Sequence, residues 1–421
     1  MSTARLAELE GAVRRLDSTV ARMRATSGTG LDVRLSSSGF VAQSADGRYV
    51  LRLRGYFQSD TRIPLGSAAA DLSRGLLLRR VRPIWEASLG KVADVRLMPD
   101  FGEGRPTIYD AHLDLHFTPA LNLRSGKFKP PVGLERLQSA TDIAFIERAH
   151  PNSLVPNRDV GTQLYGDLSR AVSYAVGVFN GVPDIGFGDV DTDRFKDLVG
   201  RVAVEPLKWR KTPTADELVL GLSGSRGEHR GTVSAPQLQT YKSPMQESVF
   251  HFRGDGTAAG TVVADGPQQR LSPHAYAALS RVSAMGEYVV STQAVRRATT
   301  STTLRQRAWE VTGVVNLTGE HASFRGLTPR RPFDPGKHAF GALELAVRAS
   351  ALTVDPDAFP LLADPASQVQ RAATRGVGLN WHLVKGVKVM VDYTNTRFRG
   401  GASTGDRPAE HNLSTRFQHA F

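Results

Sequence analysis

The sequence predicts an all-β protein, a 16-stranded antiparallel transmembrane β-barrel preceded by a short N-terminal coiled-coil helix. Three observations lead to this fold class. Apolar residues alternate with polar ones, often arginines, along many segments, and sixteen such segments follow one another. No apolar run reaches the roughly 18 residues that mark a transmembrane helix, whereas many of the alternating segments reach the roughly 9–11 residues of a tilted membrane strand.

The alternation is clearest in the first two segments. Residues 49–58 read YVLRLRGYFQ, and residues 77–89 read LLRRVRPIWEASL. Successive side chains of a strand point to opposite faces, so each segment separates an apolar face from a positively charged one. The apolar face is the core in a soluble sandwich, but it contacts lipid in a membrane barrel, whose lumen the arginines then line.

The N-terminal region is the one clear helix. Between residues 4 and 25 apolar side chains recur at spacings of three and four, at Leu6, Leu9, Val13, Leu16, Val20 and Met23. This is about three heptads, enough for a coiled coil when another interface brings chains together, and the alternative is a solitary amphipathic helix docked on the main body. Ser27–Gly30 then acts as a flexible link. We therefore expect two regions, the helix and linker at 1–30 and the barrel at 31–421.

The remainder of the chain divides into alternating segments separated by Gly, Pro, Asp and Asn. The sixteen predicted strands are 49–59, 75–90, 91–101, 106–118, 120–129, 160–169, 171–180, 194–206, 216–226, 268–283, 284–297, 304–317, 338–354, 368–384, 385–399 and 409–421. Short turns are predicted at 90–91, 119–120 and 385–386, and longer connections at 130–159, 227–267 and 355–367. Short turns on one rim and long loops on the other are typical of outer-membrane barrels.

The last strand supports a membrane location. Residues 411–421 read HNLSTRFQHAF and end in an aromatic residue, Phe421, on the face that also carries Leu413 and Phe417. This resembles the terminal strand of bacterial outer-membrane proteins. Met1–Arg14 has no apolar central region of a signal peptide, so we expect an exported form of the chain to be a mature one. The predicted location is the bacterial outer membrane.

Composition limits the partners. The chain of 421 residues has a formal net charge of +12, a pI near 10.1 and no cysteine. The charge suits anionic solutes or surfaces, but it is spread along the chain and no recognition helix or zinc finger accompanies it, so nucleic acid is not an expected partner. Without cysteine there is neither a disulfide framework nor a thiolate metal site.

Strand parity alone predicts a set of pore-lining arginines. Each lies opposite an apolar face: Arg52, Arg54, Arg80, Arg82, Arg96, Arg124, Arg201, Arg348 and Arg416. In a barrel they would concentrate anions in a narrow water-filled space. The alternative is that they pair with inward acids and merely fill the lumen; those acids are Glu86, Asp94, Asp110, Asp114, Glu344 and Asp392.

Other chemistry is not indicated. His112, Asp114 and His116 share one face of a predicted strand and could in principle bind a transition metal, but filling of the lumen explains them equally well. Residues 221–227, GLSGSRG, lack the spacing of a nucleophile elbow, and no phosphate-binding GKS or GKT run is present. We therefore expect no enzyme activity, metal or cofactor.

A stretch after the fifth predicted strand carries a family resemblance. Residues 126–135 read GKFKPPVGLE, and further matches lie at 139–143, 145–148, 158–161, 177–181, 262–266, 272–276 and 287–289. Together they resemble the phosphate-selective porins of the O and P type over roughly residues 45–421. The resemblance implies a trimeric sixteen-stranded outer-membrane porin, with a coiled-coil-like segment before the barrel and a third extracellular loop that folds inward.

The resemblance places the inward loop at 130–159 and its basic residues at the constriction. Lys127, Lys129, Arg136 and Arg158 lie in or beside the matched motifs, and Arg124 joins them by strand parity. Lys127 and Lys129 have the lipid-facing parity, so they reach the pore only if the strand has already bent, which Pro130 and Pro131 make plausible.

The predicted function is diffusion of anions, phosphate or polyphosphate first, through a basic lumen with a loop constriction. A homotrimer in outer-membrane lipid is the expected assembly. Three alternatives stay open: a broader porin for anions or small carboxylates, a plugged structural barrel, and a soluble binding protein.

Overall fold

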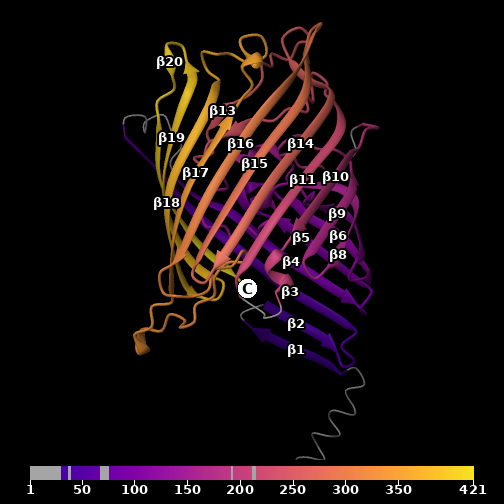
Figure 1. The fold of residues 1–421 in the computed structure, drawn as a ribbon, viewed down its shortest axis with the longest axis vertical. Helices are drawn as coiled ribbons and strands as arrows, with labels where there is room; N and C mark the ends of the chain where they lie inside the picture. The colour runs from indigo at the N-terminus through magenta and orange to yellow at the C-terminus, as the bar shows by residue number, and fades with distance from the viewer. Residues whose placement is uncertain (1–29, 37–38, 67–74, 191–192, 211–214) are drawn as a thin grey trace, which may run out of the picture.

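A computed structural model describes residues 30–36, 39–66, 75–190, 193–210 and 215–421 of the chain. They form a closed barrel of sixteen antiparallel strands, tilted in Figure 1 and colour-ordered around the wall. The barrel closes where the last strand pairs with the first, from His411 opposite Leu65 to Ala420 opposite Tyr56. The all-β, 16-stranded prediction is confirmed. Within the described residues, no helix has the length and apolarity needed to cross a bilayer.

Each wall strand corresponds to one predicted segment. The sixteen are β3 (Tyr49–Leu65), β4 (Gly75–Leu89), β5 (Ala93–Asp100), β6 (Thr107–Thr118), β7 (Leu121–Phe128), β8 (Asp159–Ser169), β9 (Val172–Phe179), β10 (Asp197–Val204), β11 (Glu217–Arg230), β14 (Val262–Leu279), β15 (Val282–Arg297), β16 (Thr300–Asn316), β17 (Ala342–Thr353), β18 (Val369–Val384), β19 (Val387–Ala402) and β21 (Glu410–Ala420). The period-two pattern is therefore a reliable guide here, because every wall strand has one lipid-facing side.

Shorter elements lie outside the wall. They are β1 (Leu31–Ser36), β2 (Gly39–Ser44), η2 (Gly102–Gly104), α2 (Leu134–Leu137), η3 (His150–Leu154), η4 (Pro206–Trp209), β12 (Tyr241–Lys242), β13 (Ser248–Phe250), η5 (Pro335–Lys337), η6 (Pro356–Ala358) and β20 (Gly405–Asp406). The β1–β2 hairpin pairs with the start of β3, where Phe40 lies opposite Leu53. The predicted helix at 4–25 lies outside the described residues, so the division at residue 30 stays a prediction.

The two ends of the barrel differ in their connections. The end that carries the C-terminus, the turn rim, has short links at 90–92, 119–120, 170–171, 280–281 and 385–386. The opposite end, the loop rim, has long links at 129–158, 180–196, 231–261 and 354–368. This matches the expected asymmetry, in which the turn rim faces the periplasm and the loop rim the exterior.

Three connections depart from the predicted alternation, and one of them is the twelve-residue link 205–216 on the turn rim, which contains η4. Residues 298–299 form a two-residue link on the loop rim, and residues 317–341 form a long link on the turn rim, visible in orange below the barrel in Figure 1. The start of the long link folds into the barrel, where the rings of Phe324 and Tyr276 lie 5.2 Å apart. It is therefore a folded segment with contacts of its own, which strand counting alone does not reveal.

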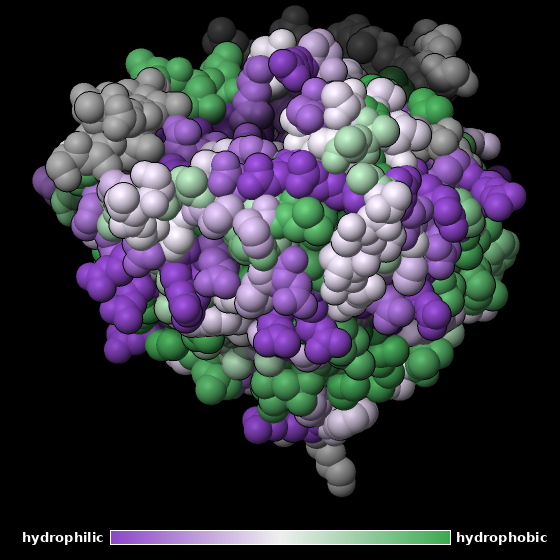
Figure 2. All heavy atoms as spheres, turned by 90° about the horizontal axis from the view of Figure 1, so that it is seen from above, coloured by the Kyte–Doolittle hydropathy of each residue, from purple (hydrophilic) through white to green (hydrophobic). Residues whose placement is uncertain are grey.

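Side chains follow the predicted inside–outside pattern. Exposed apolar residues such as Phe57, Trp85, Val202, Val377 and Phe417 cover the outer wall. Viewed from above in Figure 2, hydrophilic residues occupy much of the middle of the loop end, and strongly hydrophobic ones gather mainly toward the edge. The wall thus presents an apolar surface to the bilayer.

Part of the interior is packed rather than open. At the loop end, Phe250 and Leu362 from two long connections pack with the inward-facing Leu304 of β16 and Leu352 of β17 in one apolar cluster. This packing fills the loop end of the interior beside β16 and β17, and the open space that remains is lined mainly by β3–β8, β17–β19 and β21.

Candidate functional site

The connection 129–158, here named the constriction loop, crosses the lumen. β7 ends at Phe128, and Pro130 and Pro131 follow, which have no N–H to continue the ladder. The loop then turns at Gly133, whose φ of 84° lies in the left-handed region that favours glycine. The sequence therefore directs the chain away from the wall at this point.

Polar side chains from many strands hold the constriction loop in place. Leu134 N donates to the Glu287 carboxylate of β15 at 2.8 Å, and Ile146 N donates to Asp392 of β19 at 2.5 Å. The remaining anchors are Arg348 to Glu135 (2.6 Å), Asn380 to the Ala144 carbonyl (2.9 Å), Gln58 to the Ala140 carbonyl (3.0 Å) and Gln418 to the Thr141 carbonyl (3.2 Å). Attachment to strands around the wall makes the loop a rigid partition across the channel.

An open cavity of about 880 Å³ remains between the constriction loop and the wall. Twelve basic side chains line it: Arg54, Arg79, Arg80, Arg82, Arg96, Arg124, Lys129, Arg136, Arg148, Arg158, Lys242 and Arg348. Five acidic side chains line it: Glu103, Asp110, Asp142, Glu147 and Asp392. This excess of cations in a confined space favours anions over cations.

Several of these cations are neutralised by acids. Arg82 binds Asp100 at 2.7 Å, and Arg79 binds Glu147 at 2.7 Å. Arg158 binds Asp110 at 2.7 Å. Glu86 pairs with both Arg54 and Arg96, and Arg124 pairs with Asp114 at 2.8 Å. For these side chains the lumen-filling interpretation describes the geometry well.

Four buried or half-buried cations on the cavity wall have no carboxylate partner within the described part of the chain: Arg80, Lys129, Arg136 and Arg148; the exposed Lys242 has none either. Arg80 donates to the side-chain oxygen of Gln58 at 2.6 Å, and the others donate to backbone carbonyls, as Lys129 does to Gln138 at 3.0 Å. Carbonyl oxygens carry only partial charge, so these four retain uncompensated positive charge.

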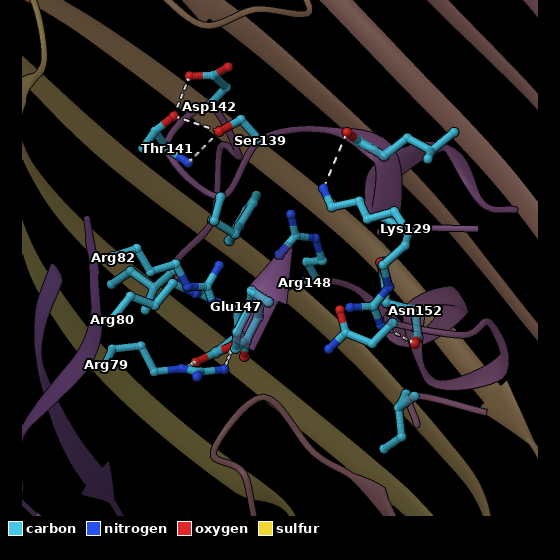
Figure 3. Close-up of a pocket in the computed structure, with 18 of the residues that line it drawn as sticks. Arg79, Arg80, Arg82, Lys129, Ser139, Thr141, Asp142, Glu147, Arg148 and Asn152 are labelled. Carbon is cyan, nitrogen blue, oxygen red and sulfur yellow. Dashed lines mark hydrogen bonds and ion pairs between the residues drawn. The ribbon is translucent and has the colours of Figure 1, made fainter. Parts of the chain in front are cut away.

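The uncompensated cations lie close to other cations. Figure 3 shows Arg79, Arg80 and Arg82 extending from β4 toward Glu147, with Lys129 beyond it on the constriction loop. Burial, together with the guanidinium groups of Arg158 and Arg148, holds the pKa of Lys129 well below its usual range. An anion in the cavity would relieve this repulsion.

The structure separates the two lysines that the sequence grouped. Lys129 lines the cavity, but Lys127 does not; it is buried against the connection 180–196, where it pairs with Asp189 and its ammonium lies 5.6 Å from the Phe187 ring centre. Its opposite strand parity, noted in the sequence, accounts for this position.

Most of the other predicted residues line the cavity: Arg54, Arg80, Arg82, Arg96, Arg124, Arg136, Arg158 and Arg348. Three do not. Arg52 donates to Ser88 at 3.0 Å near the turn rim, Arg201 lies on β10 away from the cavity, and Arg416 makes a buried two-pronged contact with Asp60 at 2.6 and 2.7 Å.

Sequence reasoning did not select Arg79 and Arg148. Arg79 has the parity of a lipid-facing residue, but the register shifts there: Gln58 lies opposite Arg80, and Ser59 lies opposite Leu78. The bulge leaves Arg79 unpaired in the ladder and lets two consecutive arginines face the lumen. A bulge has no clear signature in this sequence. Arg148, by contrast, belongs to the matched stretch 145–148 and could have been found there.

The residues considered for a metal do not converge. His116 binds Asp94 at 2.8 Å and Asn122 at 2.9 Å, whereas His112 approaches Asp114 at 3.4 Å. No group of metal-ligating side chains is present among the residues that the structure describes.

Comparisons with known proteins agree with this architecture. Residues 74–421 match a family described as phosphate-selective porin O and P. Among solved structures, the outer-membrane channel DcaP of Acinetobacter baumannii is 12% identical, covers 91% of this chain and 100% of its own, and has a TM-score of 0.56.

Two further solved structures share the fold. OprB of Pseudomonas putida is 10% identical, with 89% of this chain and 95% of that chain covered and a TM-score of 0.55. OmpT of Vibrio cholerae in its trimer form is 9% identical, with 89% and 100% covered and a TM-score of 0.51. No curated protein sequence matches the chain.

Proposed function

This chain belongs to the family of phosphate-selective porins O and P and is a porin of the bacterial outer membrane, and we propose that it selects anions, with phosphate and polyphosphate as preferred solutes. The observation that carries the proposal is the charge of the cavity, where twelve basic side chains outnumber the five lining acids and four buried or half-buried cations contact no carboxylate of the described residues. Such an excess raises the local concentration of anions and repels cations.

The four uncompensated cations give the proposal its mechanism. Paired arginines such as Arg82 contribute little net charge. By contrast, no carboxylate in the part of the chain that the structure describes neutralises the charge of Arg80, Lys129, Arg136 or Arg148. A guanidinium can donate two parallel hydrogen bonds to a phosphate, which distinguishes this oxyanion from chloride. Binding is shared among side chains at several points of an open cavity, so an ion can leave as well as enter.

We further propose that the porin is a homotrimer in outer-membrane lipid. The trimer form of the similar Vibrio cholerae OmpT supports this assembly. So do exposed apolar residues near the loop rim of the first two wall strands: Ile63, Leu65, Leu76 and Leu78. The mass of the detergent-solubilised complex tests the assembly, and a monomer mass would refute it.

Bilayer recording tests the selectivity. The reversal potential in a KCl gradient should indicate chloride over potassium, and added phosphate should reduce the chloride current by occupying the cavity. A cation-selective reversal potential would refute the anion proposal. Equal block by phosphate and succinate would identify a broader anion porin, and the absence of any current would identify a plugged barrel.

Substitutions of single basic residues test whether phosphate blocks the chloride current at the cavity. Lys129→Met should weaken block by phosphate, since it removes a cavity charge with no acid partner. Arg331→Gln is a matched control, because it removes an exposed charge from the connection 317–341 on the turn rim. An equal effect of both substitutions would assign the block to general surface charge instead.

A further inference from the structure

The outer wall carries a group of arginines at the loop-rim ends of three strands. These are Arg307 on β16, Arg371 and Arg375 on β18, and Arg397 and Arg399 on β19, here named the outer arginine cluster. All five are exposed. The even-numbered Thr374 of β18 faces the lumen and contacts His150 of the constriction loop at 2.9 Å, so the odd-numbered neighbours point outward.

The cluster lies directly above the apolar belt. Below Arg375 on the same face of β18 come Val377 and Leu379, both exposed to the bilayer. Trp309 and Tyr393, also exposed, lie two residues below Arg307 on β16 and four below Arg397 on β19. Aromatic side chains mark the boundary between hydrocarbon and headgroups, so the arginines lie at headgroup level on the external side.

The strand register brings like charges together. Arg371 lies directly opposite Arg399, and the same row continues through Thr353 of β17 to Arg307. Like charges in opposed positions destabilise a sheet. No ion pair joins any cluster member to an acid in the described part of the chain, so the protein itself leaves this repulsion uncompensated.

The cluster is confined to one side of the barrel. At the same rim, the outward residues of β3 and β4 are Ile63, Leu65, Leu76 and Leu78, which are apolar. Outward arginines also stand at the loop-rim end of β11, at Arg226 and Arg230, but there Glu228 lies between them and Asp265 pairs with Arg230. The outer arginine cluster instead indicates a localised site for an anionic ligand in the outer leaflet.

We propose that the outer arginine cluster binds the phosphate groups of a phosphorylated glycolipid in the outer leaflet, of the kind that lipid A represents. Arg371 and Arg399 hold one phosphate between them, and Arg397 and Arg375, on the two successive outward rows below, contact the sugar–phosphate backbone. Guanidinium forks match phosphate oxygens in pairs, and adjacent strands lie close enough for two side chains to share one group. The lipid thereby neutralises the opposed charges.

Lipid binding to the purified full-length porin in detergent tests the proposal. Bisphosphorylated lipid A should bind more tightly than the same lipid with its phosphates removed. The double variant Arg371→Gln/Arg399→Gln should weaken binding about 30-fold, since each basic side chain at a charged lipid surface contributes roughly a factor of five. The control Arg325→Gln/Arg331→Gln, with the same loss of charge at the opposite rim, should bind as the unmodified chain does.

The outcomes distinguish binding of lipid phosphate from binding of free phosphate, and lipid binding from anion selectivity. Equal affinity for the two lipids, or an unchanged affinity of the double variant, would overturn the proposal. Complete competition by millimolar inorganic phosphate would also overturn it and assign the cluster to free anions. Chloride selectivity should stay unchanged in the double variant, because the cluster lies outside the lumen. A test without substitution is the salt dependence of lipid A binding to the unmodified chain: affinity should fall as salt rises, and an affinity that salt does not change would overturn the proposal.

Discussion

Arg80 offers the sharpest test of how the channel selects anions. It lies on the cavity wall, its side chain donates to Gln58 at 2.6 Å, and it has no acid partner in the described residues. The substitution Arg80→Gln removes one positive charge and keeps a side chain that can bond to Gln58. We expect the channel to fold, to conduct and to lose affinity for phosphate.

The size of the loss follows from Coulomb's law. A phosphate about 6 Å from the guanidinium, in a partly water-filled space with an effective dielectric constant of about 40, gains roughly 1.4 kcal/mol per negative charge. This corresponds to about a tenfold rise in the phosphate concentration that halves the chloride current. A paired arginine such as Arg82 is a less direct target, because its removal also leaves the buried carboxylate of Asp100 without a partner.

Single-channel recording in KCl with phosphate titrated in measures this concentration. Arg52→Gln is the matched control. Like Arg80, Arg52 has the inward strand parity, but it lies on β3 and contacts Ser88 outside the cavity. A block in the Arg80 variant equal to that of the control, in channels with normal assembly, would refute the role given to uncompensated charge.

Three further predictions address the loop and its supports. Because its lowered pKa makes Lys129 lose its proton at a lower pH than an ordinary lysine, chloride-over-potassium selectivity should fall as pH rises, beginning below the pH at which an ordinary lysine titrates. Lys129→Arg should remove part of that fall in reversal-potential measurements. Lys127→Met should leave block by phosphate unchanged, because Lys127 is paired with Asp189 outside the cavity. A weakened block would show that Lys127 does contribute to phosphate binding. Glu135→Gln should remove the carboxylate charge that the buried Arg348 contacts at 2.6 Å and so loosen the constriction loop. Noisier and larger single-channel currents would report this, whereas steady currents of normal size would contradict the anchoring.

The local pattern of the chain determined the architecture. Every predicted strand from 49–59 to 409–421 corresponds to a wall strand, because alternation with period two is a property of neighbouring residues. The same rule placed Arg54, Arg82 and Arg96 in the lumen and cast doubt on Lys127. The family-like stretch 126–135 then identified the loop that lines the cavity.

Only the tertiary structure decided which charges are free. Arg80 and Arg82 look equivalent in the sequence, but Asp100 neutralises one and no acid neutralises the other, since ion pairs join strands whose register the sequence does not specify. The bulge that turns Arg79 inward is likewise a property of two paired strands.

The outer arginine cluster shows the same division. Strand parity in the sequence is sufficient to place Arg371 and Arg399 on an outward face, yet these residues are distant along the chain, and only the pairing of β18 with β19 sets them opposite each other. Parity depends on the covalent geometry of one strand, so the sequence by itself determines it. Which charged side chains become neighbours depends on the register between strands and on the path of the constriction loop, and long-range contacts alone decide both.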